Sequence, residues 1–268
     1  MKLRLTGELA RVLSAIVLVP VVVWVVLSIS PVGFLFVLAL VGLLAFREFD
    51  SIAAAQGIAP SGWLGLIAGL ILLLTPEPAL PVLVMIALAL MAAKLRLDDL
   101  SKALPSMSAA VLGIVYIFGA WRCAAALREI NPHWLMIALL VCWAGDTAAL
   151  YVGRAFGKHK LAPVVSPSKT WEGAIGSLIG GVAAGGVYAH FLIPPAPLWA
   201  VLATAAAANI AGQLGDLCES ALKRGAQVKD SGTSLPGHGG WLDRIDSSLF
   251  AIPVVYGILK LTLAYPWR

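Results

Sequence analysis

The chain has 268 residues, of which 60% are hydrophobic and only 12% are charged. Soluble globular domains carry about 25% charged residues, so this composition excludes an ordinary water-soluble fold. The net charge of +5 does not indicate a nucleic-acid partner, because lysine and arginine in a membrane protein chiefly mark the sidedness of its loops. Long apolar runs recur from end to end and predict an all-α, polytopic integral membrane helical bundle.

About nine transmembrane segments are expected along the chain. The third and fourth are shorter than the ~20 residues of a full span, and are tilted neighbours, a kinked pair or a re-entrant hairpin. We interpret residues 1–130 as an N-terminal transmembrane region used for packing and as a candidate subunit interface. Residues 131–268 form the expected catalytic region, with cytoplasmic loops at 153–172 and 219–246. The nine segments lie at about 11–29, 32–46, 61–75, 79–94, 107–127, 133–152, 173–193, 197–218 and 247–265.

The basic residues fall almost entirely in alternate loops between these segments. The positive-inside rule therefore predicts a cytoplasmic N-terminus and an outside C-terminus. It also places the loop at 219–246 on the cytoplasmic side, where nucleotides are. The residues that carry this prediction are Lys2, Arg4, Arg11, Arg47, Lys94, Arg96, Lys102, Arg154, Lys158, Lys160, Lys169, Lys223, Arg224, Lys229 and Arg244.

The stretch from Gln213 to Ser247 concentrates acids, bases and glycines in an otherwise apolar chain. Carboxylates hold hard metal ions, basic side chains hold phosphate oxygens, and glycines let a backbone approach a ligand. On a helix Asp216 and Lys223 share a face, and the spacing of Asp243 and Asp246 puts both carboxylates on one side. The pattern indicates a nucleotide-phosphate site; the alternative is a solvated, mixed-charge loop.

A second polar cluster begins at Asp146, near the end of the sixth segment, where an ionisable group needs a cavity, a metal or a partner. The basic residues of 153–160 lead to Ser168, Lys169 and Thr170 at the expected start of the next helix. Free N–H groups at a helix start suit a phosphate, but Ser168 or Thr170 could equally be plain N-caps. The basic run could equally anchor the chain beside anionic headgroups.

Two further segments are interpreted as structural. The loop from Arg47 to Pro60 is expected to be a solvated connector. The seventh segment repeats glycine at small-x3-small spacing, in Gly176/Gly180 and Gly181/Gly185, which favours close helix packing within or between subunits.

The polar stretches resemble the phosphatidate cytidylyltransferase (CDP-diacylglycerol synthase) family. The resemblance covers roughly residues 140–250 and includes the upstream block Ser-Pro-x-Lys-Thr-Trp-Glu-Gly from Ser166 to Gly173. One departure is Trp241, where the family usually carries an aliphatic residue. The downstream signature has no insertion or deletion and reads Ser220, Lys223-Arg224, Lys229-Asp230, Pro236, His238-Gly239-Gly240, Asp243-Arg244 and Asp246.

The resemblance implies a membrane nucleotidyltransferase that converts CTP and phosphatidate to CDP-diacylglycerol and pyrophosphate, with Mg²⁺ as cofactor. We expect Asp216, Asp243 and Asp246 to be metal ligands and, with Lys223, catalytic; Asp146 is a weaker metal candidate. His238 either orients a phosphate or is a structural loop residue, and the family match favours binding. The expected substrate-binding residues are Ser220, Arg224, Lys229, His238, Gly239, Gly240, Arg244, Ser168 and Lys169.

We further expect a homodimer in the cytoplasmic (inner) membrane with no nucleic-acid partner. The alternative function is a secondary transporter, whose intramembrane charges would couple ion movement. No inverted repeat, which many such transporters carry, is visible in the sequence.

Overall fold

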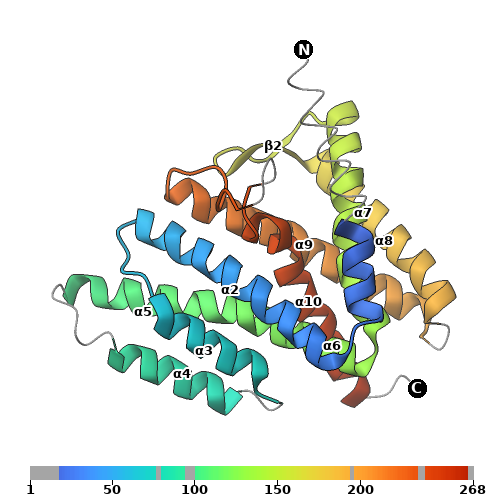
Figure 1. Cartoon of the computed structure of the whole chain (residues 1–268). Helices are drawn as coiled ribbons and strands as arrows, with labels where there is room; N and C mark the ends of the chain where they lie inside the picture. The colour runs from blue at the N-terminus through green and yellow to red at the C-terminus, as the bar shows by residue number, and fades with distance from the viewer. Residues whose placement is uncertain (1–17, 77–79, 94–99, 194–195, 235–238, 265–268) are drawn as a thin grey trace. The chain divides into compact units, whose positions relative to one another are not determined.

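The structure, a computed structural model, describes residues 18–76, 80–93, 100–193, 196–234 and 239–264 (Figure 1). The chain divides into two compact units. Unit 1 comprises Met1–Gly119 and Val228–Arg244, and unit 2 comprises Ala120–Gln227 and Ile245–Arg268. The segment that carries the second half of the signature therefore belongs with the N-terminal unit. The predicted functional division at residue 130 remains a prediction.

Unit 1 contains α2 (Pro31–Ala55), α3 (Gly62–Leu74), α4 (Leu80–Ala93), α5 (Ala103–Gly113) and the π-helical turn η3 (Ile114–Gly119), with the short η2 (Leu100–Lys102) before α5. A further apolar helix, Leu18–Leu27, precedes α2. α2 begins where Ser30 accepts a hydrogen bond from the Gly33 N–H, with Pro31 as its first residue. Proline suits this position because a first-turn N–H has no partner within the helix.

Aromatic rings pack together in the core of unit 1. Phe46 of α2 packs against Phe49 and Phe118, with ring centroids 6.3 and 5.7 Å apart. Two glycines make room for these rings, since a side chain at Gly69 would collide with Phe118 and one at Gly113 would collide with Phe49. The buried face of α2 is therefore fixed against α3 and α5.

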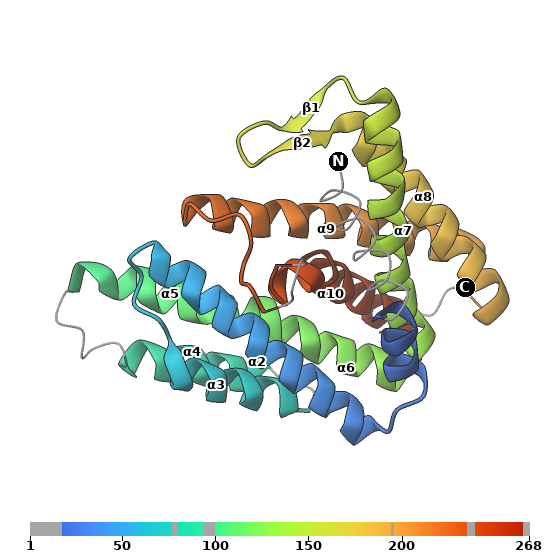
Figure 2. The same ribbon diagram turned by 45° about the horizontal axis from the view of Figure 1, so that its top comes forward.

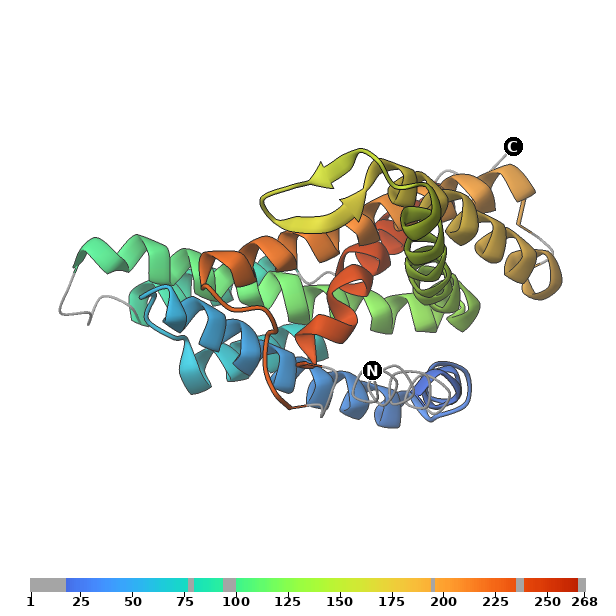
Figure 3. The ribbon, with the colours of Figure 1, turned by 90° about the horizontal axis from the view of Figure 1, so that it is seen from above.

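Unit 2 contains α6 (Ala120–Ile130), α7 (Pro132–Phe156), α8 (Trp171–Leu192), α9 (Leu198–Gly225) and most of α10 (Leu242–Ala264). Between α7 and α8 the chain forms an antiparallel hairpin of β1 (Lys160–Ala162) and β2 (Ser166–Thr170) (Figures 2 and 3). We predicted a helix start at Ser168 to Thr170, but Ser168 lies in β2. Thr170 is the N-cap of α8 and accepts from the Gly173 N–H, so only that capping alternative is confirmed.

The glycine face of α8 packs on α7. A side chain at Gly176 would meet Val152, and one at Gly180 would meet Ala148. Farther along, Gly185 faces Val141 and Ala205. Large apolar residues of α8, namely Ile175, Ile179, Val187 and Phe191, are instead exposed. Small residues inside and large apolar residues outside are expected where lipid is the solvent, so the packing interpretation of these glycines is confirmed within the chain.

The expectation of a polytopic helical membrane protein is confirmed. Each of the nine predicted apolar segments contains a helix, and six of these helices are long and apolar enough to cross a membrane. The helices Leu18–Leu27, Gly62–Leu74 and Leu80–Ala93 are shorter. The number of crossings therefore remains a prediction. Lys2, Arg4, Arg11, Lys94 and Arg96, which contribute to the predicted sidedness, lie outside the described residues.

The interpretation of Arg47 to Pro60 as a solvated connector is wrong for its first half. α2 continues through this polar stretch to Ala55. Asp50 accepts from the N–H groups of Ser61 and Gly62, at 2.8 Å each, and so fixes the start of α3. Glu48 is 7% exposed. These two polar residues therefore lie on a helix and bind backbone N–H groups elsewhere in unit 1.

The α7–α8 contact predicts a clear stability effect at Gly176. In Gly176→Ala the new Cβ would lie 2.7 Å from Val152, so one helix must shift, and we expect a loss of about 1–3 kcal/mol. Gly257→Ala in α10 is the matched control, because among the described residues no atom beyond its own helix backbone lies within 4 Å of its new Cβ. Thermal unfolding in detergent would measure both. Equal melting temperatures for the two variants would contradict the packing described.

Candidate functional site

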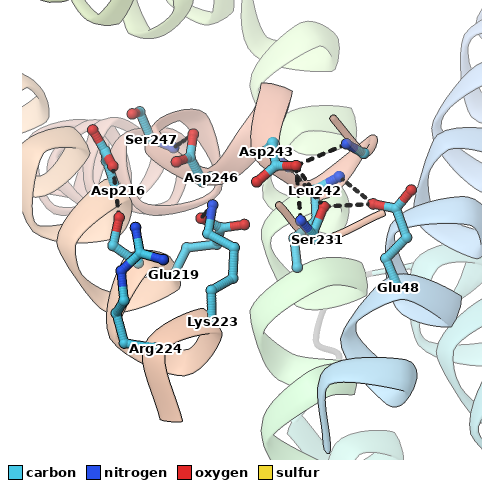
Figure 4. A network of polar contacts seen from close by, with 12 residues as sticks. Glu48, Asp216, Glu219, Lys223, Arg224, Ser231, Leu242, Asp243, Asp246 and Ser247 are labelled. Carbon is cyan, nitrogen blue, oxygen red and sulfur yellow. Dashed lines mark hydrogen bonds and ion pairs between the residues drawn. The ribbon is translucent and has the colours of Figure 1, made fainter. Parts of the chain in front are cut away.

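Three carboxylates from three helices of unit 2 lie close enough to act on one another. They are Asp146 of α7, Asp216 of α9 and Asp246 of α10. The charge of Asp216 acts on both of the others, and Asp146 also acts on Asp246. Figure 4 shows the side chains of Asp216 and Asp246 near one another. Three of the four predicted metal ligands are thus brought together within one unit.

Glycines allow these helices to approach. Gly215, directly before Asp216, has the Asp246 carbonyl oxygen 2.7 Å from the position of a Cβ, and the Phe250 ring at 2.9 Å. Gly212, one turn earlier, faces Ser247 of α10 and Cys142 of α7. Larger residues at these positions would move α10, and Asp246 with it, away from Asp216.

A buried amide network joins α7, α8 and α9 beside the aspartates. The Asn209 Nδ2 donates to the Val141 carbonyl at 3.3 Å and to the Ser177 hydroxyl at 3.2 Å. Its Oδ1 accepts from the Gln213 Nε2 at 2.7 Å, and that nitrogen also donates to the Ala174 carbonyl. Buried polar groups with satisfied bonds fix one arrangement of their helices. Asp216, one turn after Gln213, is therefore held on a rigid part of α9.

The hairpin brings a cation to the carboxylates. Lys169 of β2 forms an ion pair with Asp216, Nζ to Oδ2 2.5 Å, and both side chains are partly accessible, at 26% and 31%. The Lys169 charge also acts on Asp146. Glu172, in the first turn of α8, secures the hairpin base by accepting from the Lys158 and His159 N–H groups and pairing with the His159 ring.

The catalytic role of Lys223 stays a prediction, and the structure shows the surroundings of its side chain. It is buried and forms an ion pair with Glu219, one turn earlier on α9, whose side chain is 0% exposed. Its charge also acts on Asp246. Lys223 therefore lies between a buried carboxylate and the aspartate group, where it can balance the local negative charge.

Asp243 lies in unit 1 and organises its own loop. Its Oδ2 is 2.9 Å from the Ser231 N–H, 3.0 Å from the Ser231 hydroxyl and 2.7 Å from the Gly240 N–H. Gly239 has a φ of +75°, which favours glycine, and a Cβ there would be 2.5 Å from the Asp243 Oδ2. The contact with Asp243 therefore explains why the loop has a glycine at 239.

The other predicted site residues are distributed over both units. In unit 2 the Ser220 hydroxyl donates to the Asp216 Oδ1 at 3.4 Å, the Arg224 Nε donates to the Val165 carbonyl at 3.4 Å, and Ser168 is exposed on β2. In unit 1 Lys229 and Arg244 are exposed. His238 lies outside the described residues. These binding roles remain predictions.

The sequence interpretation missed Glu48. Its carboxylate accepts hydrogen bonds from the loop that contains Asp243, although the two are far apart in the chain. The available signal was a glutamate followed by further polar residues at the end of an apolar segment, in Arg47-Glu48-Phe49-Asp50.

The aspartates of unit 2 could hold Mg²⁺ only if a substrate supplied further oxygen ligands. Within the described ranges, no three acidic, histidine or cysteine side chains come close enough to hold a metal ion by themselves. Mg²⁺ commonly uses one or two protein carboxylates and completes its shell with water and phosphate oxygens. Asp216 and Asp246, with Asp146 nearby, fit that limited role.

The sequence model of the cytidylyltransferase family matches residues 9–262. The chain is 34% identical to the phosphatidate cytidylyltransferase of Staphylococcus aureus (strain COL) over 228 residues, which cover 81% of this chain and 85% of that protein. It is 43% identical to the protein of that name from Staphylococcus haemolyticus over 162 residues, 60% of each chain. With the one from Bacillus subtilis (strain 168) it shares 39% identity over 153 residues, 56% of this chain and 57% of the relative.

The buried ion pair predicts an effect of Lys223 on stability that is separate from its predicted catalytic role. Lys223→Met leaves the fully buried Glu219 without the cation of its ion pair, which should cost about 3–5 kcal/mol. Adding Glu219→Leu should restore most of that loss, because the buried charge is removed as well. Denaturant unfolding in detergent would measure the cycle. A double variant no more stable than Lys223→Met would show that the unpaired Glu219 charge does not cause the loss of stability.

Proposed function

Because this chain belongs to the cytidylyltransferase family, we propose that it is a phosphatidate cytidylyltransferase. It would join the cytidylyl group of CTP to phosphatidate and release pyrophosphate. The names of its relatives support this substrate pair. The structural observation that carries the proposal is the gathering of Asp146, Asp216 and Asp246 with Lys169 in unit 2.

The proposed reaction joins two anions. A phosphate oxygen of phosphatidate attacks the α-phosphorus of CTP, a new P–O–P bond forms, and the bond from the α-phosphorus to the bridging oxygen breaks. The electron pair leaves with pyrophosphate. The nucleophile is already charged, so the main requirement is to position the reactants and to neutralise the charge on the triphosphate.

The side chains of unit 2 suit this requirement. Lys169 and Asp216 form an ion pair. With a nucleotide bound, Lys169 would pair with a phosphate oxygen and Asp216 would be a ligand of Mg²⁺. Asp246 would be the second carboxylate toward Mg²⁺, with Asp146 nearby. A bound Mg²⁺ supplies charge neutralisation at the phosphate oxygens. Lys223 would hold Asp246 in place and balance its charge.

Arg224, in the last turn of α9, is proposed to bind a further phosphate oxygen. Lys229 and Arg244 are exposed in unit 1, and their substrate-binding role stays a prediction. The metal-ligand role of Asp243 stays a prediction, because its Oδ2 already serves the loop.

The test uses purified protein in liposomes with phosphatidate and CTP labelled in the cytosine ring. We expect label to enter the lipid phase only when phosphatidate and a divalent cation are both present, with release of one pyrophosphate per lipid labelled. Uptake of solute by sealed vesicles without CTP would instead favour a transporter. Folded protein that labels no lipid with any nucleotide would refute the proposed activity.

Asp216→Asn examines the carboxylate on which the proposal depends. It should lower kcat by about 100-fold or more while leaving the melting temperature near that of the parent, because a developing charge loses its stabilisation. Asp50→Asn is the matched control, since Asp50 accepts hydrogen bonds from backbone N–H groups at the start of α3. An Asp216→Asn variant with parental turnover would remove Asp216 from the site.

We also propose that the N-terminus and the nucleotide site face the cytoplasm, where CTP is present. Reporter fusions after Arg268 would test the topology: a periplasmic reporter should be active and a cytoplasmic one inactive. The reverse pattern would contradict the predicted outside position of the C-terminus. The homodimer stays a prediction, and the α8 glycines do not support it because they pack on α7.

A further inference from the structure

Glu48 is a buried carboxylate with four hydrogen-bond donors from one loop. Its Oε1 accepts from the Ser234 hydroxyl at 2.9 Å and the Trp241 N–H at 3.0 Å. Its Oε2 accepts from the Ser231 hydroxyl and the Leu242 N–H, both at 2.9 Å. Figure 4 shows Glu48 directed from α2 toward Ser231 and Leu242. All of these residues belong to unit 1.

Each carboxylate oxygen serves one hydroxyl and one backbone N–H, so the four bonds hold both ends of the loop. The loop glycines fit the same contact. A Cβ at Gly240 would collide with the Glu48 carboxylate, and one at Gly232 would lie 2.7 Å from its Oε1. Trp241 contacts Glu48 through its backbone, so its departure from the family residue leaves this bond intact.

The other side of the loop is held by Asp243, whose Oδ2 also approaches the Ser231 hydroxyl. That hydroxyl has one proton and lies within reach of both carboxylates, so it links Glu48 to Asp243. The described parts of the loop, 231–234 and 239–242, are thereby held by two acids, one from the signature and one from α2.

The position of a full carboxylate here is costly. Glu48 is 7% exposed, and burying a charge is unfavourable unless it is well satisfied. Its donors in the described structure are neutral hydroxyl and amide groups. A charged acceptor makes stronger hydrogen bonds than a neutral one. We therefore expect the Glu48 carboxylate to hold the described loop residues that it bonds more rigidly than a neutral side chain would. Rigidity is useful where a backbone must present side chains to a ligand.

We propose that Glu48 is a positioning residue for nucleotidyl transfer. It fixes Ser231–Ser234 and Gly239–Leu242 within unit 1, and thereby the flanking Lys229 and Arg244, whose predicted role is to bind phosphate. This inference rests on the proposed function, and it gives the N-terminal half of the chain an indirect part in substrate binding, through the loop. Glu48 itself does not contact the substrate in this proposal.

Glu48→Gln is the central variant. Its single amide oxygen can accept from the N–H of Trp241 or Leu242, and its NH₂ group then faces the other N–H donor to donor. Asp50→Asn is the matched control, because it alters a second carboxylate of α2 that accepts two backbone N–H groups outside the loop. Ser234→Ala is a milder variant that removes one of the four bonds at an exposed residue.

We expect Glu48→Gln to lower kcat/KM for CTP by about tenfold or more, while KM for phosphatidate changes by less than about twofold. Ser234→Ala should lower kcat/KM for CTP by a smaller factor, about threefold. Asp50→Asn should leave both parameters within about twofold of the parent. Amide hydrogen exchange in peptides covering Gly239–Arg244 should be faster by about tenfold in Glu48→Gln and unchanged in Asp50→Asn.

Each outcome decides the inference. Parental kinetics in Glu48→Gln, or losses in Glu48→Gln and Asp50→Asn that are equal and follow their melting temperatures, would overturn it. If Glu48→Gln does not fold, parental kinetics in Ser234→Ala would do the same. A parent protein that labels no lipid would instead refute the proposed function, a result separate from an active parent whose loop variants stay unaffected.

Discussion

Helices in lipid gain no hydrophobic free energy from associating, so they depend on close van der Waals contact and on polar bonds between them. The second unit relies on both. Glycines of α8 rest on α7, and Gly212 and Gly215 of α9 admit α10. The Asn209 network then joins α7, α8 and α9 within two helical turns of Asp216. The placement of Asp216 and Asp246 follows from contacts that contain no catalytic group.

Charge in this protein is arranged in small, locally balanced sets. Lys169 faces Asp216, and Lys223 faces Glu219. Glu48 is balanced differently, by dipoles of the loop. An ion pair with partly accessible members can open for a substrate, whereas a carboxylate enclosed by neutral donors has no competing partner to exchange. The accessible pair of Lys169 and Asp216 suits substrate binding, whereas the enclosed Glu48 carboxylate suits the support of a loop.

The helices could be predicted because long apolar runs have one stable form in a membrane. The grouping of Asp216 with Asp246 was accessible through motif spacing and family resemblance. The β1–β2 hairpin was not, because strands of three and five residues leave no periodic signal. Glu219 and Lys223 have the spacing of a helical ion pair, but sequence does not reveal that both are buried. Glu48 escaped prediction because its partners lie 183 to 194 residues away.

That same separation has a consequence for how the protein is made. At about 5–20 residues per second, the ribosome needs roughly 10–40 s to reach Ser231–Leu242 after it has added Glu48. Until then the carboxylate must be solvated by water or by the insertion machinery, because its donors do not yet exist. Unit 1 therefore cannot be completed before the chain has been synthesised through α9, although most of its helices are translated first. The N-terminal half begins assembly early and finishes late.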